Sequence, residues 1–414
     1  MMLQPERAAT AWNPDMVRGD FPLIANMSER GRTIYLDSAA SAQKPRCVMD
    51  SMADAAFTRY ANVHRGAHWL SGLATEGYEG ARAGLQAFLN ASGPEQIIFT
   101  KSATEAINLV ASAFASFVEP GDEIVVSALD HHANLIPWHM LRERRGVVLR
   151  WVDPDPRGNL DPAAFDDAIT PRTRLVAVTH MSNVMGVLTP LEAIVRIAHD
   201  RGVPVLADGT QAAVHHPIDV AALDVDFYAL TGHKLYGPTG IGALYAKTEW
   251  LERMPPMLGG GEMVAVVGRD HVEYAAAPHK FEAGTPPILE AIGLATALDY
   301  IDRVGHSTIA AHETALGCHA RARLAALPDI TIFGDPEKPG PILTFASAAA
   351  HANDIAAILD SKGICVRAGA HCTQPLHHML GFSSTCRASF AMYSTLQEVD
   401  ALADAVEDAL KILK

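Results

Sequence analysis

The chain has few cysteines and no excess of positive charge, and both absences narrow its function. Only five of its 414 residues are cysteine, and the formal net charge is −14. An odd cysteine number without paired spacing excludes a disulfide framework or zinc cluster and is typical of a reducing compartment. The acidic balance argues against a nucleic-acid or anionic-membrane surface. We therefore predict no metal, nucleic-acid or membrane partner; the cysteines are Cys47, Cys318, Cys365, Cys372 and Cys386.

The chain also lacks a long apolar run, although 49% of its side chains are hydrophobic. A membrane-spanning helix needs about 18 or more consecutive apolar residues, and none is present. The first residues, MMLQPERAATAWNPD, lack the apolar core of a signal peptide. We find no internal repeat, and we expect a cytoplasmic protein with a large core and more than one domain.

The stretch from Ala207 to Gly242 organises the rest of the chain around Lys234. This lysine follows an apolar run, 227–230, that predicts a buried strand, and it precedes a turn rich in glycine and proline. A lysine held between a strand end and a rigid turn lies at the rim of a pocket. Partial desolvation there lowers the pKa of the amine and frees its nucleophilic form.

Asp208 ends the preceding apolar run, 203–207, so an acid and a lysine follow two buried strands. Pyridoxal phosphate requires such a pair, a lysine that binds its aldehyde and a carboxylate that holds the proton of its ring nitrogen. A lone lysine beside a loop is usually a surface residue. The surrounding polar side chains favour a cofactor site instead; they are Gln211, Thr231 and His233.

This segment closely resembles the cofactor segment of the NifS-like cysteine desulfurases of the class-V aminotransferase family. The SUF-pathway (SufS-like) branch is the most similar, with SGHKLYGPTGIG where this chain has TGHKLYGPTGIG. The likeness runs from about Arg18 to the C-terminus. It implies pyridoxal 5'-phosphate as cofactor, bound to Lys234, and the fold type I of enzymes that use it.

The strand pattern agrees with an α/β fold. Seven predicted strands alternate with helices, which favours a mostly parallel sheet with helices on both faces. From about Ala291 the pattern changes to a long helical stretch and then to an α+β arrangement. We predict a large cofactor-binding domain over 25–295, and a small α+β domain from 1–24 and 296–414. The seven strands are expected at 97–100, 123–129, 147–152, 174–180, 203–207, 227–231 and 242–246.

A phosphate site is predicted where the first of these strands meets a helix. Ser102-Ala-Thr-Glu105 has the spacing of a capping box. A helix N-terminus binds anions through its free N–H groups and its dipole, so we assign the cofactor phosphate to Ala103 and Thr104. Many strand-to-helix junctions look alike, and this assignment gains its weight from the match to the family.

The resemblance implies further roles around the cofactor. The first histidine of Asp130-His-His-Ala-Asn stacks on the ring and moves protons in the family, which points to His131, whereas His132 is expected to be structural. The asparagine of Ser182-Asn-Val-Met-Gly lies beside the ring oxygen and the substrate carboxylate, which points to Asn183.

Two other motifs imply a homodimer with shared active sites. The threonine of FEAGTP reaches the phosphate of the other subunit in the family, and here it is Thr285. Pro287 stands where the family often has asparagine, which leaves the details of this loop open. The motif NVHRGAH lies near the active site in the family, so His64 and Arg65 are candidate substrate contacts.

The second decisive stretch is RAGAHCTQP, which contains Cys372. Small residues precede this cysteine and predict a mobile loop, and the neighbouring Arg367 and His371 favour a nucleophilic thiolate. Arg367 is also a candidate substrate-binding residue. The family pattern is R-x-G-x-H-C-x-x-P, with a second histidine often present where this chain has Ala370. In the motif CRAS the family's arginine clamps the substrate carboxylate in a bidentate fork, which points to Arg387; a structural ion pair is the alternative.

The resemblance implies conversion of L-cysteine to L-alanine with a persulfide on Cys372, supplying iron–sulfur cluster assembly through a SufE-like or SufU-like acceptor. In the implied reaction Lys234 removes the Cα proton of the substrate and Asp208 keeps the ring nitrogen of the cofactor protonated. His131 assists the protonation that releases alanine. A selenocysteine lyase or cysteine-sulfinate desulfinase on the same fold remains the alternative. A sulfur carrier with a vestigial cofactor site would not need these residues, and a plain aminotransferase would leave Cys372 without a role.

Overall fold

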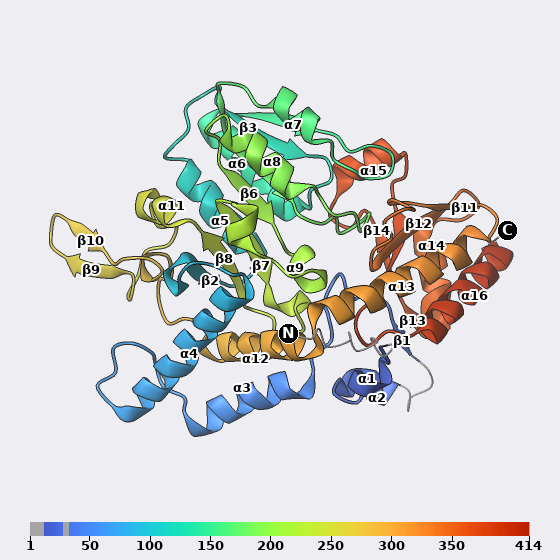
Figure 1. The fold of residues 1–414 in the computed structure, drawn as a ribbon, viewed down its shortest axis with the longest axis horizontal. Helices are drawn as coiled ribbons and strands as arrows, with labels where there is room; N and C mark the ends of the chain where they lie inside the picture. Colours follow the sequence, from blue (N-terminus) through green and yellow to red (C-terminus); the bar gives the residue numbers. More distant parts are fainter. Residues whose placement is uncertain (1–11, 28–32, 414) are drawn as a thin grey trace, which may run out of the picture.

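The computed structural model describes residues 12–27 and 33–413, and it contains a central seven-stranded sheet (Figure 1). Strand β8 runs antiparallel to its neighbours β2 and β7, and the other adjacent pairs are parallel. The predicted mostly parallel sheet is confirmed. In spatial order the strands are β2 (Ile97–Thr100), β8 (Gly242–Ala246), β7 (Phe227–Thr231), β6 (Val205–Asp208), β5 (Thr173–Thr179), β3 (Glu123–Ser127) and β4 (Val148–Val152).

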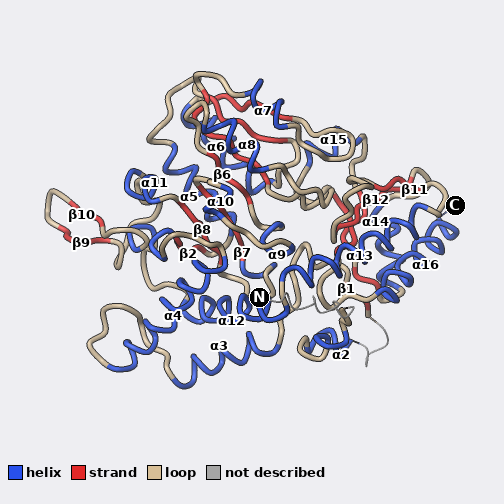
Figure 2. The backbone as a smooth tube through the Cα atoms, viewed as in Figure 1, coloured by secondary structure: helices blue, strands red, loops and turns tan. Residues whose placement is uncertain are grey.

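Helices cover both faces of this sheet because side chains along each strand alternate between two apolar clusters. In β3, Ile124 and Val126 pack into one cluster and Val125 into the other. The first cluster includes residues of α5 (Ala103–Phe114), α6 (Ile136–Arg145) and α11 (Thr248–Arg253). The second cluster takes residues from α3 (Arg46–Thr58), α4 (Trp69–Phe88), α7 (Pro162–Ala168), α8 (Leu191–His199), α9 (Ala212–His215), α10 (Val220–Leu223) and α12 (Ile288–Val304). Figure 2 shows the helices in blue around the strands of the central sheet in red.

A second, antiparallel sheet lies beside the central one and has an apolar cluster of its own. Its strands follow the order β11 (Ile330–Ile332), β12 (Ile342–Ser347), β15 (Thr385–Ser389) and β14 (Arg367–Gly369). The cluster is completed by α13 (His306–Ala325), α14 (Ala352–Ser361) and α16 (Leu396–Leu413). Helix α15 (Gln374–Leu380) follows the loop that contains Cys372.

The N-terminal part of the chain joins the two sheets. Strand β1 (Ile34–Tyr35) pairs in parallel with β13 (Ile364–Cys365), and Asp37 forms a bridge with Ser389 of β15. A few residues later, the N–H of Ala42 donates to the carbonyl of His233, 3.1 Å away. Helices α1 (Asp15–Arg18) and α2 (Pro22–Met27) precede this segment. Of the residues 1–24 that we assign to the small domain, 1–11 lie outside the described residues.

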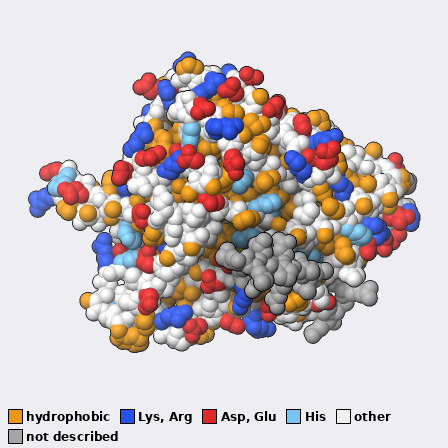
Figure 3. Space-filling model, viewed as in Figure 1, with side chains coloured by type: hydrophobic (Ala, Val, Ile, Leu, Met, Phe, Trp, Pro, Cys, Tyr) orange, Lys and Arg blue, Asp and Glu red, His pale blue; other side chains and the backbone are white. Residues whose placement is uncertain are grey.

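The long helical stretch predicted after Ala291 is formed by two helices, α12 and α13, which Gly305 separates with a φ of +92°. A hairpin of β9 (Val264–Val267) and β10 (Val272–Tyr274) was not predicted; it stands out from the body (Figure 3) and exposes Val267 to 66%. Short 3-10 turns complete the fold: η1 (Pro94–Gln96), η2 (His132–Asn134), η3 (Gly232–Lys234) and η4 (His279–Phe281). Among the described residues, none of the helices has the length and apolar character required to span a bilayer.

Candidate active site

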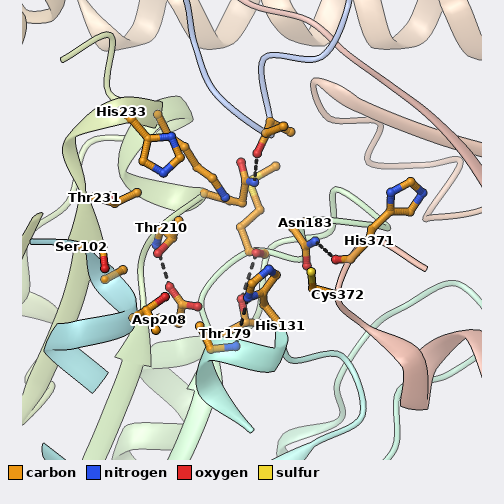
Figure 4. Close-up of a pocket in the computed structure, with 18 of the residues that line it drawn as sticks. Ser102, His131, Thr179, Asn183, Asp208, Thr210, Thr231, His233, His371 and Cys372 are labelled. Carbon is orange, nitrogen blue, oxygen red and sulfur yellow. Dashed lines mark hydrogen bonds between the residues drawn. The ribbon is translucent and has the colours of Figure 1, made fainter. Parts of the chain in front are cut away.

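A cavity of about 300 Å³ lies where three neighbouring strands of the central sheet end. The last residues of β5, β6 and β7 are Thr179, Asp208 and Thr231, and all three line it. The carboxyl ends of parallel strands meet at one sheet edge, where α/β proteins bind ligands. Loop residues from the second sheet close the opposite side, so Cys372 faces the same space as Asp208 (Figure 4).

Lys234 lines this cavity from the turn η3, directly after β7. The turn is fixed by its backbone: Gly232 N–H donates to Ile241, and the carbonyl of Gly232 accepts the N–H groups of Leu235 and Gly237. The preceding peptide is also held, because the carbonyl of His233 accepts the Nζ of Lys44 at 3.2 Å. These hydrogen bonds therefore fix the backbone from which the Lys234 side chain extends.

The protein environment makes the Lys234 amine easier to deprotonate. Its pKa is lowered to about 8, chiefly by burial and next by Arg387, while Asp208 opposes the shift. Removal of the ammonium from water disfavours the charged form, and a nearby guanidinium adds repulsion. A larger share of this amine than of an ordinary lysine is free to act as a nucleophile or base near neutral pH.

Several buried polar atoms around Asp208 have no protein partner. Asp208 itself is 4% exposed and accepts the N–H of Thr210 at 3.0 Å. The hydroxyls of Thr210 and Thr231 and the Oε1 of Gln211 are buried without a hydrogen-bond partner among the described residues. Unpaired buried polar atoms are costly, so a cluster of them in one cavity indicates a polar ligand.

The predicted phosphate-binding residues lie at the N-terminus of α5 and line the cavity. Ser102 is the N-cap, and its hydroxyl accepts the N–H of Glu105 at 3.4 Å. Ala103 and Thr104 open this 12-residue helix. The helix start can approach β8 closely only because residue 242 is glycine. A Cβ there would lie 2.7 Å from the backbone of Ser102.

His131 lines the cavity beside Ala133, as expected for a group next to a ring. Its Nδ1 accepts the N–H of Ala133 at 3.1 Å, so a neutral ring carries its proton on Nε2. Burial, reinforced by Lys234, lowers the pKa of His131 to about 3. The ring is uncharged at neutral pH and therefore a weak base.

The loop with Cys372 is anchored by hydrogen bonds at two points. The N–H of His132 donates to the carbonyl of Cys372 at 2.8 Å, and Asn183 Nδ2 donates to the carbonyl of His371 at 2.9 Å. His371 and Cys372 have φ values of +49° and +55°, a strained conformation typical of functional loops. The Oδ1 of Asn183 accepts the hydroxyl of Thr373, so both ends of its amide contact this loop.

The predicted positive neighbours of Cys372 are only partly present. Burial, reinforced by Arg387, lowers the pKa of His371 to about 2, so this histidine is neutral and cannot favour a thiolate by charge. The expectation from the sequence was wrong here, because burial cannot be read from a motif. The positive charges in the cavity wall come instead from Arg367 and Arg387.

Arg387 is 3% exposed and extends from β15 into the cavity wall. Its Nη1 donates to the carbonyl of Asn183 at 2.9 Å, and its Nη2 lies 3.4 Å from Asp37 Oδ1. Its Nε has no hydrogen-bond partner within residues 12–27 and 33–413. Arg367 donates to both carboxylate oxygens of Asp37, at 3.1 and 2.8 Å. A half-free guanidinium in a cavity is suited to bind a carboxylate.

The structure does not bring His64 or Thr285 into this cavity. His64 Nε2 lies 2.8 Å from Glu79 Oε1, and its ring contacts that of His279. Thr285 lines a separate cavity with Phe281. The implied role of Thr285 involves another subunit, so it concerns an assembly of two chains.

Sequence reasoning missed several residues that line or support the site. Thr210 could have been found, because it lies between Asp208 and Gln211 in DGTQ. Thr179 ends a buried strand. Asp37 stands in the segment YLDSAA, whose small residues suit backbone packed close to a ligand, but nothing in that segment singles out its side chain.

Comparisons with known proteins place the chain in one enzyme family. The sequence model of the aminotransferase class-V family matches residues 34–402. A probable cysteine desulfurase of Streptomyces coelicolor is 45% identical over 402 residues, covering 95% of this chain and 96% of the relative. The crystal structure of the Escherichia coli cysteine desulfurase CsdA, 40% identical, superposes with a TM-score of 0.90 over 98% of this chain and 100% of that one. The apo structure of a cysteine desulfurase of Thermococcus onnurineus, 37% identical, superposes with a TM-score of 0.92 over 98% of this chain and 100% of that one.

Proposed function

This chain belongs to the class-V aminotransferase family, in which cysteine desulfurases match nearly its whole length, and we propose that it converts L-cysteine to L-alanine with pyridoxal phosphate. The sulfur passes to Cys372. The observation that supports this most is the shared cavity of Lys234, Asp208 and Cys372. A lysine and acid alone would fit many reactions of the cofactor, and the facing thiol selects sulfur transfer.

The residues present fit pyridoxal phosphate. When bound, the cofactor holds the substrate's nitrogen through its aldehyde and draws electrons away from Cα. Lys234 would hold it covalently, and Asp208 would hold the proton of the ring nitrogen. The N-terminus of α5 at Ala103 and Thr104 suits the phosphate. The ring of His131 and the unpartnered oxygens of Thr231, Thr210 and Gln211 suit its remaining surface.

Side chains of the protein carry out the other steps of the reaction. Arg387 binds the substrate carboxylate with donors that face the cavity, and the amine of Lys234 takes the Cα proton. The Cys372 thiolate then attacks the substrate's sulfur. A bond forms between the two sulfurs, the substrate's C–S bond breaks, and its electron pair stays with the three-carbon fragment. That fragment takes up protons to become alanine, and Cys372 retains a persulfide.

The proposal is tested by alanine release from L-cysteine by the purified holoenzyme. Cys372→Ala should lower the rate at least about a hundredfold, because the nucleophile is lost. Cys318→Ala is a matched control, since Cys318 is exposed on α13 and outside the cavity. Retention of wild-type alanine release by Cys372→Ala would refute the proposal.

We further propose that the persulfide supplies iron–sulfur cluster assembly through a SufE-like or SufU-like acceptor. The TGHKLYGPTGIG motif and the exposure of Cys372 support transfer to another protein. Stimulation of alanine release when each acceptor is titrated in would identify it. We also propose a homodimer, in which Thr285, outside its own chain's cavity, reaches the phosphate of the other subunit. Analytical ultracentrifugation tests this assembly.

A further inference from the structure

Two histidines and a glutamate meet at a place that the candidate active site does not use. His64 lies in the loop before α4, Glu79 lies within α4, and His279 opens η4. Each side chain offers one nitrogen or oxygen atom, and these three atoms lie within 4.8 Å of one another. The cavity of Lys234 is lined by other residues. In this chain the histidine of NVHRGAH therefore belongs to a second cluster.

The two residues near α4 are held so that their side chains meet. The N–H of His64 donates to Thr75 Oγ1 at 2.8 Å, which fastens the loop to α4. His64 has a φ of +70°, a backbone conformation that is strained for a residue with a side chain and that clusters at ligand sites. Its Nε2 lies 2.8 Å from Glu79 Oε1. A nitrogen and an oxygen that can both bind a metal are therefore already adjacent.

The carboxylate of Glu79 is oriented by Arg82, which leaves Oε1 for a further partner. The Nε of Arg82 donates to Glu79 Oε2 at 2.8 Å, and only a longer contact of 3.3 Å reaches Oε1. Metal-binding carboxylates are typically oriented by hydrogen bonds of this kind. Arg82 also donates to both oxygens of Glu282, at 2.6 and 2.9 Å. Two carboxylates and one guanidinium leave a net charge of −1, so Arg82 does not exclude a cation.

His279 completes the cluster from a distant part of the chain. Its ring lies edge-on to that of His64, with the ring centroids 4.9 Å apart. Burial lowers the pKa of His279 below its ordinary value, so the ring is neutral at neutral pH and offers a nitrogen lone pair. All three side chains are only partly buried, so an ion can enter from solvent.

We propose that His64, Glu79 and His279 bind one divalent transition-metal ion such as zinc. Two imidazoles and a carboxylate are a ligand set that zinc accepts, with water in the fourth position. Ligand atoms about 2.1 Å from zinc lie about 3.4 Å apart in a tetrahedron, so His64 Nε2 and Glu79 Oε1 separate by about 0.6 Å. The ion takes the place of the proton between these two atoms, and His64 carries its proton on Nδ1.

The ion joins the loop before α4 to η4, and it needs neither pyridoxal phosphate nor substrate. The inference therefore goes beyond the proposed function and does not depend on it. The prediction that the chain binds no metal rested on its cysteines, and this site contains none.

The test is calorimetric titration of the chelator-treated holoenzyme with zinc chloride. Every arm carries Cys372→Ala and Cys318→Ala, because exposed thiols also bind zinc. One ion per chain should bind with a dissociation constant of about 10 μM or lower. His279→Phe keeps a ring against His64 but removes the nitrogen, and it should raise this constant at least about tenfold. His271→Ala, an exposed histidine between β9 and β10, is the matched control and should leave it unchanged.

Weaker binding than this before His279 is changed would overturn the inference. A rise of less than tenfold in His279→Phe, or an equal rise in His271→Ala, would overturn it as well. Anomalous scattering from crystals of the wild-type holoenzyme soaked in zinc chloride covers the case in which His279→Phe does not fold. A zinc peak in contact with His64, Glu79 and His279 is the expected result, and the absence of a peak among them would contradict the proposal.

Discussion

Gly242 offers a test of the predicted phosphate site that does not depend on turnover. A Cβ at this position would lie 2.7 Å from Ser102 Cα, from Ser102 C and from the carbonyl oxygen of Leu230. Ordinary van der Waals contact begins near 3.4 Å, so the backbone must move by about 0.7 Å. Leu230 belongs to β7, next to β8 in the sheet, so the start of α5 is the part that can move.

In Gly242→Ala we therefore expect displaced N–H groups at Ala103 and Thr104. Overpacking of this kind typically costs about 1–3 kcal/mol of folding free energy. A loss of about 1.4 kcal/mol from the phosphate contacts would raise the dissociation constant for pyridoxal phosphate about tenfold. Titration of the apoenzyme with cofactor, followed by absorbance, measures this change, and urea unfolding measures the stability.

Gly80→Ala is the matched control, because a Cβ at this position in α4 meets nothing within 4 Å. It should leave cofactor binding unchanged and should not reduce stability. If Gly242→Ala bound pyridoxal phosphate as tightly as wild type, the assignment of the phosphate to the start of α5 would be wrong.

Three further predictions follow from buried charges. Glu282→Gln should lower the free energy of unfolding in urea by about 3 kcal/mol, because the guanidinium of Arg82, 1% exposed, loses its buried charged partner and keeps only Glu79, whose side chain is 36% exposed. Asp408→Asn, at an exposed ion pair, should have no measurable effect, and equal effects would refute the argument. The rate at which pyridoxal phosphate attaches to the apoenzyme, followed by absorbance, should increase as the pH rises to about 8 and then level off. The free amine of Lys234 is the reactive form, and its pKa is lowered to about 8. A rate that continued to increase up to the ordinary pKa of lysine would contradict this. Arg387→Lys should raise KM for L-cysteine at least about tenfold, because an ammonium cannot form the bidentate fork, and an unchanged KM would exclude Arg387 as the clamp.

Much of the fold and site could be predicted because the signals are local. Buried runs such as 203–207 and 227–230 mark strands, and the polar residue after each falls at the same sheet edge when the strands are parallel. Lys234 and Asp208 were therefore found together. The exposed strands β9 and β10 carry no burial pattern, and their hairpin was missed.

What could not be predicted depends on the three-dimensional arrangement. Asp37 and Arg367 are 330 positions apart, and only the pairing of β14 with β15 shows that one carboxylate serves two arginines. The neutrality of His371 follows from burial among residues that no motif includes. Thr285 is implied to act in another subunit, so a single chain cannot show its role.

The most direct test of the proposed chemistry is the fate of the sulfur in a single turnover. The holoenzyme is mixed with less than one equivalent of L-cysteine in the absence of acceptor, alkylated, digested and analysed by mass spectrometry. One added sulfur atom on the peptide with Cys372, matched by an equal amount of alanine, is the predicted result. Alanine formed without sulfur on that peptide, or sulfur on the Cys318 peptide instead, would contradict the account.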